Sequence, residues 1–255
     1  MREEVVTSRQ NPLCARFRKL AASRTFREET GEFLCDSPKL LAEAAKWGAA
    51  LCAVAYTKRE LLPEGLPVDV RLVQVSESVM ESVSPAKTPQ GVVFSCKLPP
   101  PPDVERLGPG RYLLLEGVQD PGNVGTVLRT ANAFGWEVFL LEGCADLYSP
   151  KTVRAAMGVH FRSKTVCTSL ERAAALVKSS GLPLYAAALG EDTADIRQAD
   201  LSNCAVIIGS EGRGVSSRAL ALCGATVKIP MESCCESLNA AVAAGIVLWE
   251  GYRTL

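Results

Sequence analysis

The sequence contains little of what several common catalytic mechanisms require. His160 is the only histidine among 255 residues, so Ser-His-Asp and Cys-His catalysis are disfavoured. A zinc site would depend on ten cysteines that are irregularly spaced and include no Cys-x-x-Cys pair. We therefore expect no metal. The sequence leaves open whether His160 is a structural histidine or lies on the surface.

The sequence also lacks a long apolar run. Its longest apolar stretch, Leu238 to Trp249, is shorter than the roughly 20 residues that a helix needs to span a bilayer. The opening residues, Met1-Arg2-Glu3-Glu4, do not resemble a secretion signal. We predict a cytoplasmic protein without membrane contact, in which the cysteines are buried free thiols rather than disulfides.

Charge of neither sign is in excess, because 28 basic and 28 acidic residues balance, yet the charge is uneven near the start. No residue between Val5 and Arg27 is acidic. A local cluster of cations can neutralise the phosphates of a nucleic acid even in a neutral protein. The alternative is a helix face that is simply solvated. The candidate phosphate contacts in this stretch are Arg9, Arg16, Arg18, Lys19, Arg24 and Arg27.

A run of four prolines, Pro99 to Pro102, divides the sequence. Proline lacks an amide donor and restrains the residue before it, so this run cannot belong to a helix or a central strand. We predict two domains, residues 1–98 and 106–255, joined by a stiff linker over residues 99–105. The first is predicted to be a small mixed α/β domain. Its predicted helices cover residues 12–22, 38–47 and a short stretch from Ser76, and its predicted strands cover residues 32–35, 51–56, 71–75 and 91–96.

In the second domain, short apolar strands alternate regularly with helices. This alternation predicts an α/β fold with a parallel sheet that is covered by helices on both faces. Asn123 is the expected cap of a helix over residues 124–134, and Ser237 opens a closing helix over residues 237–252. Ligands of such sheets bind beyond the carboxyl ends of the strands. Further strands are predicted at residues 112–115, 138–141, 184–188, 205–208 and 226–229, and further helices at residues 151–157, 170–179 and 216–222.

Three loops of this domain carry polar residues that a core would exclude. The first, residues 119–131, contains Asn123 and Arg129, but it has neither the Lys-Ser/Thr of a Walker loop nor the glycine spacing of a dinucleotide fold. The second, residues 207–215, presents Glu211, which could bind a ligand, orient Arg129 or form a solvated ion pair in a structural turn. The third, residues 229–245, places Ser237 and Asn239 before a helix of small residues, which would also suit tight packing.

Taken in order, these loops resemble the SpoU branch of the SPOUT methyltransferases. The matching motifs are Asn123-x-Gly125-Thr126-x-x-Arg129-Thr130-Ala131, Gly209-Ser210-Glu211-Gly212-x-Gly214, and Ile229-Pro230-Met231 followed by Glu236-Ser237-Leu238-Asn239. A fourth match runs from Ser149 to Gly158 and continues at Phe161-Arg162. Upstream, Thr7 to Pro12, Gly31-Glu32-Phe33 and Thr88 to Gly91 resemble the RNA-substrate-binding domain of the family, so the resemblance covers nearly the whole chain.

The resemblance implies an enzyme that methylates a ribose 2′-hydroxyl of structured RNA with S-adenosylmethionine, with ribosomal RNA preferred over tRNA as the substrate. It implies a homodimer whose SPOUT domain contains a deep trefoil knot, preceded by a ribosomal-protein-like α/β domain. The catalytic residues of the family carry over to Asn123, Arg129, Glu211, Ser237 and Asn239. Its donor contacts carry over to Gly209, Ile229, Leu238, Leu189 and Met231.

The resemblance places Arg129 of one protomer against the methyl donor of the other. We expect this residue to position RNA and stabilise charge rather than to act as a base, because a guanidinium holds its proton at neutral pH. The sequence departs from the family at three places. Ser233 stands where the family usually has glycine, Cys234-Cys235 beside it is unusual, and Asp36-Ser37 replaces a Glu-Gly pair.

Two other functions are compatible with parts of this pattern. The first is an RNA-binding module that keeps the fold without catalysis, which the full set of polar site residues disfavours. The second is a nucleotide-dependent oxidoreductase, which the spacing of the glycines disfavours.

Overall fold

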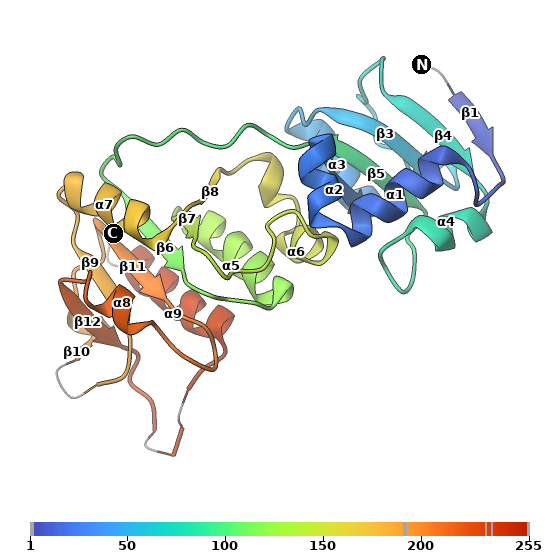
Figure 1. The fold of residues 1–255 in the computed structure, drawn as a ribbon. Helices are drawn as coiled ribbons and strands as arrows, with labels where there is room; N and C mark the ends of the chain where they lie inside the picture. The colour runs from blue at the N-terminus through green and yellow to red at the C-terminus, as the bar shows by residue number, and fades with distance from the viewer. Residues whose placement is uncertain (1–2, 191–192, 233, 236, 254–255) are drawn as a thin grey trace. The chain divides into compact units, whose positions relative to one another are not determined.

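The computed structural model describes residues 3–190, 193–232, 234–235 and 237–253. The chain folds into two compact units (Figure 1). Unit 1 comprises residues 1–100 and 146–162, and unit 2 comprises residues 101–145 and 163–255. The first passage between the units lies within the proline run, and residues 98–110 form neither helix nor strand. The segment 146–162, which the sequence pattern placed in the second domain, clusters with unit 1.

Unit 1 is built on a mixed five-stranded sheet in the order β1-β4-β3-β5-β2. Strands β1, β3 and β4 are parallel, and β5 is antiparallel to its neighbours β3 and β2. The four predicted strands are confirmed to within one residue at each end. Strand β1 was not predicted, because two of its four residues are glutamates and it pairs with β4 alone. The strands are β1 (Glu3–Val6), β2 (Glu32–Asp36), β3 (Leu51–Tyr56), β4 (Arg71–Val75) and β5 (Val92–Lys97).

Helices cover both faces of this sheet. Apolar residues of α1 and α4 pack on one face, and those of α3 and α6 pack on the other. The prediction for α1 is confirmed residue by residue, and the helix expected from Ser76 is α4, which Ser76 caps. Helix α2 was not predicted, because its sequence Arg-Thr-Phe-Arg-Glu-Glu-Thr has no apolar stripe. The helices are α1 (Pro12–Ala22), α2 (Arg24–Thr30), α3 (Pro38–Lys46), α4 (Glu77–Val83) and α6 (Pro150–Ala156), with short 3₁₀ turns at Arg59–Leu61 and Val159–Phe161.

The segment 146–162 is held in unit 1 by apolar packing and by three ion pairs. Val153 of α6 is fully buried among residues of the first hundred, and the ring of Tyr148 lies 4.9 Å from that of Phe33 between centroids. Its ion-pair partners are residues that are far away in the sequence. The ion pairs join Arg27 to Asp146, Asp36 to Arg154 and Glu43 to Arg162.

Unit 2 contains a seven-stranded, all-parallel sheet in the order β10-β12-β9-β11-β6-β7-β8. This confirms the predicted α/β class and the parallel sheet. Each of the five predicted strands is present, with its ends shifted by no more than one residue. The short strands β8 and β10 were not predicted. The strands are β6 (Arg111–Leu115), β7 (Glu137–Leu140), β8 (Thr165–Cys167), β9 (Leu184–Ala187), β10 (Ala194–Asp195), β11 (Cys204–Ile208) and β12 (Ala225–Lys228).

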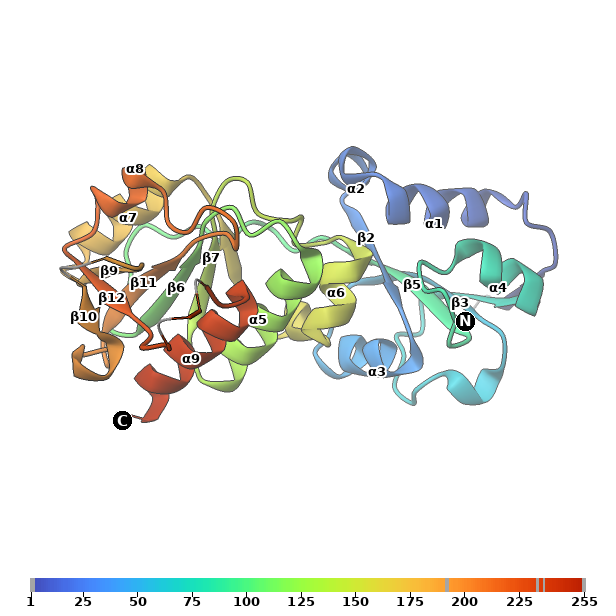
Figure 2. The same ribbon diagram turned by 90° about the horizontal axis from the view of Figure 1, so that it is seen from below.

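Helices cover both faces of the parallel sheet, as predicted. Figure 2 shows α5 (Pro121–Ala133) and α9 (Ala240–Arg253) on one side and α7 (Leu170–Ser179) and α8 (Ser217–Leu220) on the other. Tyr112 and Leu114 of β6 pack with α7, whereas the intervening Leu113 is buried on the opposite face. A 3₁₀ turn, Ile196–Gln198, precedes β11. Within the described ranges, no helix is long and apolar enough to cross a membrane.

Candidate functional site

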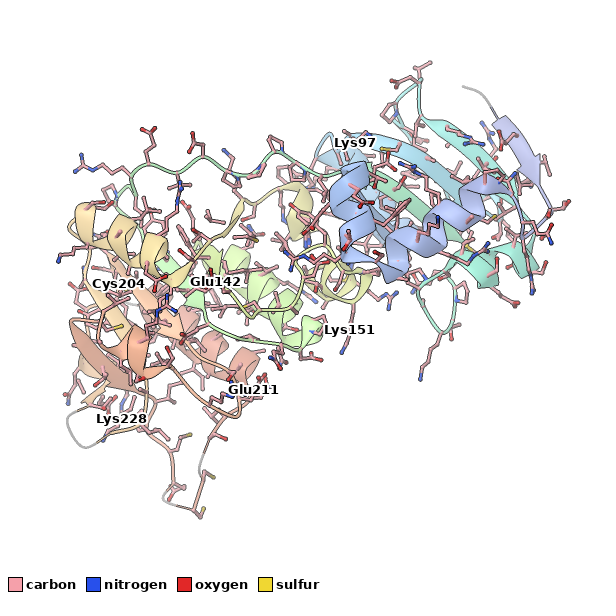
Figure 3. All side chains as sticks on the ribbon, in the orientation of Figure 1. Lys97, Glu142, Lys151, Cys204, Glu211 and Lys228 are labelled. Atoms are coloured by element: carbon pink, nitrogen blue, oxygen red, sulfur yellow. The ribbon has the colours of Figure 1, made fainter. Side chains whose placement is uncertain are left out.

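Three of the predicted site residues meet at the carboxyl edge of the unit 2 sheet. Asn123 lies in the first turn of α5, Glu211 follows β11, and Asn239 directly precedes α9. The side-chain amide of Asn123 donates a hydrogen bond to Oε1 of Glu211. Nδ2 of Asn239 donates a second bond to Oδ1 of Asn123, at 3.3 Å. Figure 3 labels Cys204 at the start of β11 and Glu211 beyond its end, on the side of the sheet where ligands of parallel α/β folds bind.

The side chain of Asn123 is available for this network because another residue caps α5. Oδ1 of Asp120 accepts a hydrogen bond from the backbone N–H of Asn123 at 2.9 Å. Pro121 occupies the first turn, where its missing N–H has no intrahelical partner to lose. The prediction that Asn123 caps the helix is therefore wrong. The pair Asp120-Pro121 starts the helix earlier, and Asn123 projects from its first turn.

Glu211 is carried by a hairpin that only glycine permits. The backbone N–H of Gly214 donates to the carbonyl of Ser210 at 2.9 Å and closes the turn. A Cβ atom on Gly209 would lie 1.9 Å from the carbonyl oxygen of Gly214. This position therefore requires glycine, because the two backbone segments approach too closely for any side chain.

Glu116 fastens the far end of this hairpin, and the sequence analysis missed it. It follows β6, and its carboxylate accepts hydrogen bonds from the backbone N–H of Ser216 at 2.9 Å and from Oγ of Ser216 at 2.6 Å. The signal was present in the sequence, because an acidic residue directly after a buried strand lies at the same edge as Glu211. Glu116 thus holds the Glu211 hairpin to the neighbouring strand.

Asn239 has two roles at the start of α9. Its Oδ1 accepts hydrogen bonds from the backbone N–H groups of Ala241 and Val242, at 3.0 and 3.3 Å. Its amide nitrogen faces Asn123, so one side chain caps the helix and joins the network. The predicted helix start at Ser237 is wrong, because the helix begins at Ala240. Ser237 is exposed ahead of it.

Arg129 lies apart from the Asn123–Glu211–Asn239 network within one chain. Its side chain is exposed and forms no ion pair with any residue that the structure describes. It follows Asn123 by six positions on α5, which turns it away from Asn123 by about 120° around the helix axis. Neither Arg129 nor Arg213 pairs with Glu211 among the described residues, so Glu211 does not form the ion pair that the sequence allowed.

Three of the five predicted donor contacts lie where three adjacent strands end. Gly209 directly follows β11, Ile229 directly follows β12, and Leu189 follows β9, which lies between those two strands. Ile229 is half-buried, as are Met231 and Leu238, whereas Leu189 is 62% exposed. Half-buried apolar side chains in the segments that follow these strands fit the adenosine of S-adenosylmethionine.

Arg27 corrects one of the predicted RNA contacts. It is 5% exposed, pairs with Asp146, and donates to the carbonyl oxygen of Leu20. A guanidinium that is buried and paired in this way is structural and cannot reach RNA. A run of charges in a sequence does not distinguish such a residue from its exposed neighbours.

The other five basic residues of the stretch differ in their partners. Arg16 pairs with Glu32 at 3.0 Å and Arg24 with Glu28 at 2.8 Å. The remaining three are exposed and have no acidic partner among the residues described for unit 1. They are Arg9, Arg18 and Lys19.

The cysteines only partly follow the prediction of buried thiols. Four are buried and all ten are thiols, but Cys167, Cys234 and Cys235 are exposed. Burial raises the pKa of the Cys52 and Cys204 thiols to about 12, so they stay protonated at neutral pH. The described residues include no group of three or more His, Cys, Asp or Glu side chains that could hold a metal ion.

His160 is a structural histidine of unit 1. Its Nε2–H donates to the carbonyl oxygen of Leu147 at 2.7 Å, and its Nδ1 is buried without a partner among the described residues. Burial lowers the pKa of the imidazole to about 4, because the charged form loses its hydration. This settles the alternative that the sequence left open.

Comparison with protein families gives two matches that follow one another along the chain. The model of the SpoU rRNA Methylase family matches residues 110–249, which include Asn123, Arg129, Glu211, Ser237 and Asn239. The model of the MRM3-like substrate binding domain matches residues 11–93.

Individual proteins are similar over nearly the full length of this chain. The 23S rRNA (guanosine(2553)-2′-O)-methyltransferase RlmP of Bacillus subtilis is 32% identical, over 96% of this chain and 97% of its own. The mitochondrial rRNA methyltransferase 3 of Homo sapiens is 30% identical, over 92% of this chain and 71% of its own. The crystal structure of an AdoMet-bound rRNA methyltransferase from Sinorhizobium meliloti is 30% identical and superposes with a TM-score of 0.89, over 99% of this chain and 98% of that one.

Proposed function

The chain belongs to the SpoU rRNA Methylase family, and we propose that it transfers a methyl group from S-adenosylmethionine to a ribose 2′-hydroxyl of ribosomal RNA. One observation carries the proposal. Asn123, Glu211 and Asn239 come from three separate motifs of the family and form one hydrogen-bonded network at the carboxyl edge of the sheet. Such a polar network at a strand-end edge is what a binding site needs and a core does not.

S-adenosylmethionine supplies an electrophilic methyl group on a positively charged sulfur. The strand ends at Gly209 and Ile229 would hold it together with Met231 and Leu238 of the segment between β12 and α9, and Leu189 would lie at the rim. Glu211 and Asn239 would orient Asn123, whose position beside the strand ends suits it to hold the ribose. The chain therefore contributes binding and orientation, which can lower a transfer barrier by several kcal/mol.

Arg129 would bind an RNA phosphate next to the target ribose and stabilise negative charge that develops on the 2′-oxygen. A role as the base is unsuitable, because a guanidinium keeps its proton at neutral pH. Ser237 would contact the ribose from the start of α9.

The site would be completed by a second copy of the chain. Arg129 points away from the network of its own chain, and α9 exposes apolar side chains that one chain leaves uncovered. Val242 is 52% exposed and Trp249 is 50% exposed. The two residues lie on the same face of α9, about two helical turns apart. The ring of Phe134, at the end of α5, lies 5.6 Å from that of Trp249. A symmetric dimer would bury this face and bring Arg129 of each protomer to the network of its partner. Family membership also supports a trefoil knot in the chain that ends in α9.

The substrate preference follows from unit 1. Residues 11–93 match a substrate-binding domain, and two similar proteins, RlmP of Bacillus subtilis and the human mitochondrial rRNA methyltransferase 3, are named for ribosomal RNA. Arg9, Arg18 and Lys19 would contact its phosphates, with Arg16 and Arg24 available on exchange of their acidic partners. Transfer RNA is the alternative substrate, and a cytoplasmic location remains a prediction.

The decisive experiment supplies labelled S-adenosylmethionine and total RNA from cells that lack this protein, and then maps the 2′-O-methylated nucleotides. We expect label in one ribosomal RNA fragment. Label in transfer RNA alone would contradict the substrate assignment. Retention of the donor without transfer to any RNA would instead support a non-catalytic RNA-binding module.

A further inference from the structure

Two neighbouring thiols lie in the loop between β12 and α9, and the proposed reaction does not use them. Cys234 and Cys235 are both exposed, and their Sγ atoms are 4.0 Å apart. We propose that this pair is a dithiol site that exchanges with small-molecule disulfides, closes to a disulfide between Cys234 and Cys235, and on closing weakens the binding of the methyl donor. The second part rests on the proposed function; the first does not.

The geometry of the loop favours closure without a large movement. The backbone N–H of Cys235 donates to the carbonyl of Glu232 at 3.0 Å, so the two cysteines occupy the second half of a turn. A disulfide needs the sulfur atoms to approach to about 2.05 Å, which rotation of the two side chains and an adjustment of the turn can provide. Neither thiol has to leave a core, because both are already in solvent.

The same geometry makes the bond easy to reduce again. Neighbouring Cα atoms are about 3.8 Å apart, which is shorter than the usual Cα separation of about 4.4–6.8 Å across a disulfide. A bridge formed in this way is strained, and strain raises its reduction potential. The site would therefore respond reversibly to the thiol–disulfide balance and would not serve as a permanent staple.

Closure would reach the donor site through the loop itself. Met231 lies on one side of the pair and Leu238 on the other, and both are predicted donor contacts. Asn239, which follows, donates to Asn123. Because the adjustment that brings the sulfur atoms together lies between these residues, it would change how they are presented to the donor.

The chemistry balances with a small disulfide as the oxidant. The thiolate of one cysteine attacks a sulfur of oxidised glutathione, forms a mixed disulfide and releases one glutathione thiolate. The second cysteine loses its proton and attacks the protein-bound sulfur of that mixed disulfide, which releases a second glutathione thiolate. Two protein thiols are oxidised to one disulfide, and one glutathione disulfide is reduced to two thiols.

Most of the other thiols would not compete in this exchange. Burial raises the pKa of Cys52 and Cys204 to about 12 and that of Cys223 to about 11, so they contain little reactive thiolate at neutral pH. Cys167 is the other exposed cysteine of the described residues and provides a control, because it has no adjacent thiol in the sequence.

The test equilibrates the full-length protein in glutathione buffers of graded redox balance, blocks free thiols and digests the protein with trypsin. Residues 229–253 lie between Lys228 and Arg253 and contain no other basic residue, so one peptide carries both cysteines and no third. We expect it to lose two hydrogen atoms on oxidation and to recover them on reduction. In parallel, the affinity for S-adenosylmethionine is measured. It should fall at least about fivefold in the oxidised protein, the lower end of typical coupling between sites.

Variants separate the possible outcomes. The Cys234→Ser/Cys235→Ser double variant should bind the donor equally in both buffers, and Cys167→Ser should behave as the wild type. Absence of the bridged peptide at any redox balance would overturn the proposal. A bridged peptide with unchanged donor affinity would overturn the coupling and leave the exchange site. If the reduced protein fails to bind the donor at all, the proposed function fails, while the peptide measurement still tests the dithiol.

Discussion

Arg154 holds the carboxylate of Asp36 with two hydrogen bonds, from Nε at 3.1 Å and from Nη2 at 2.8 Å, across a separation of 118 residues. The two ends of this pair are not equivalent. The Asp36 side chain is 7% exposed, whereas that of Arg154 is 41% exposed. Asp36 is also one of the two residues at which the sequence departs from the family's Glu-Gly pair. The carboxylate is thus used inside unit 1, to hold the segment 146–162.

This asymmetry predicts unequal costs for removing the two partners. Arg154→Ala leaves a buried carboxylate without its donor and should destabilise unit 1 by ~2–3 kcal/mol. Asp36→Asn leaves a guanidinium that water can reach and should cost only ~1 kcal/mol. Urea unfolding, followed by hydrogen exchange of the α6 amides, measures both. The exposed pair of Arg24 and Glu28 is the control, and Glu28→Ala should cost less than ~0.5 kcal/mol. Equal costs for the two Asp36–Arg154 variants would contradict the argument.

Ser37 adopts a backbone conformation that suits glycine. Its φ is 100° with ψ 145°, a region that other residues enter at a cost of ~1–3 kcal/mol. Its Oγ caps α3 by accepting from Leu40 N at 3.3 Å, and replacing such a cap with glycine costs only a few tenths of a kcal/mol. Ser37→Gly should therefore stabilise unit 1 by about 1 kcal/mol, seen as a higher urea midpoint. Ser76→Gly removes a similar cap from a residue with φ −68° and should be slightly destabilising.

Gly209 and Gly212 lie in the same hairpin but differ in the space around them. A Cβ on Gly209 would meet the backbone of Gly214 and Val215, whereas a Cβ on Gly212 meets nothing within 4 Å. Gly209→Ala should displace the hairpin, cost about 3 kcal/mol and abolish retention of S-adenosylmethionine in equilibrium dialysis. Gly212→Ala should bind the donor within about twofold of the wild type, since ~0.4 kcal/mol corresponds to that factor. Similar donor binding by both variants would show that the hairpin is not part of the donor site.

The buried imidazole of His160 should make the protein less stable in mild acid. Its pKa is lowered from an ordinary value near 6.5 to about 4, so the unfolded chain binds the proton first as the pH falls. Above pH ~6.5 the imidazole is neutral in both states and does not reduce the free energy of unfolding. This free energy falls as the pH drops from about 6.5 toward 4, and His160 lowers it no further below that pH. The effect is up to ~3 kcal/mol, because each pKa unit is worth ~1.4 kcal/mol. His160→Gln should have a flatter stability profile between pH 7 and pH 4, measured by urea unfolding. An equally steep profile in that variant would assign the pH dependence to other groups.

The proposed dimer predicts recovery of activity from two inactive variants. Arg129→Ala and Glu211→Ala should each lose transfer by roughly 10²–10³-fold, the range for removing one charge-stabilising contact. When the two are unfolded, mixed and refolded together, a heterodimer contains one site with an intact Arg129 and an intact Glu211. Random pairing should restore about a quarter of the wild-type sites. No recovery, with mixed dimers detected by mass spectrometry, would place Arg129 and Glu211 of the same chain in one site.

The sequence by itself determined the order and type of most elements of unit 2, and the identity of the polar residues at its strand ends. Those features depend on short-range rules, because hydrophobic period, helix caps and turn residues are all read within a few positions. The prediction for α7, Leu170–Ser179, is confirmed residue by residue for this reason. Where two residues near a helix start could cap it, as Asp120 and Asn123 could for α5, the local rule alone chose the wrong residue.

Only the tertiary structure decided which distant residues meet. Asn123 and Glu211 are 88 positions apart, and the charge run of the first helices gave no sign that Arg27 is buried against Asp146, 119 positions away. The segment 146–162 looks like part of the second domain by its order in the chain, yet Val153 and Arg154 find their partners in the first hundred residues. Such contacts form because a buried charge needs a partner and apolar surface must be removed from water, and the partner can come from any segment that the fold brings near. No local sequence pattern encodes that choice.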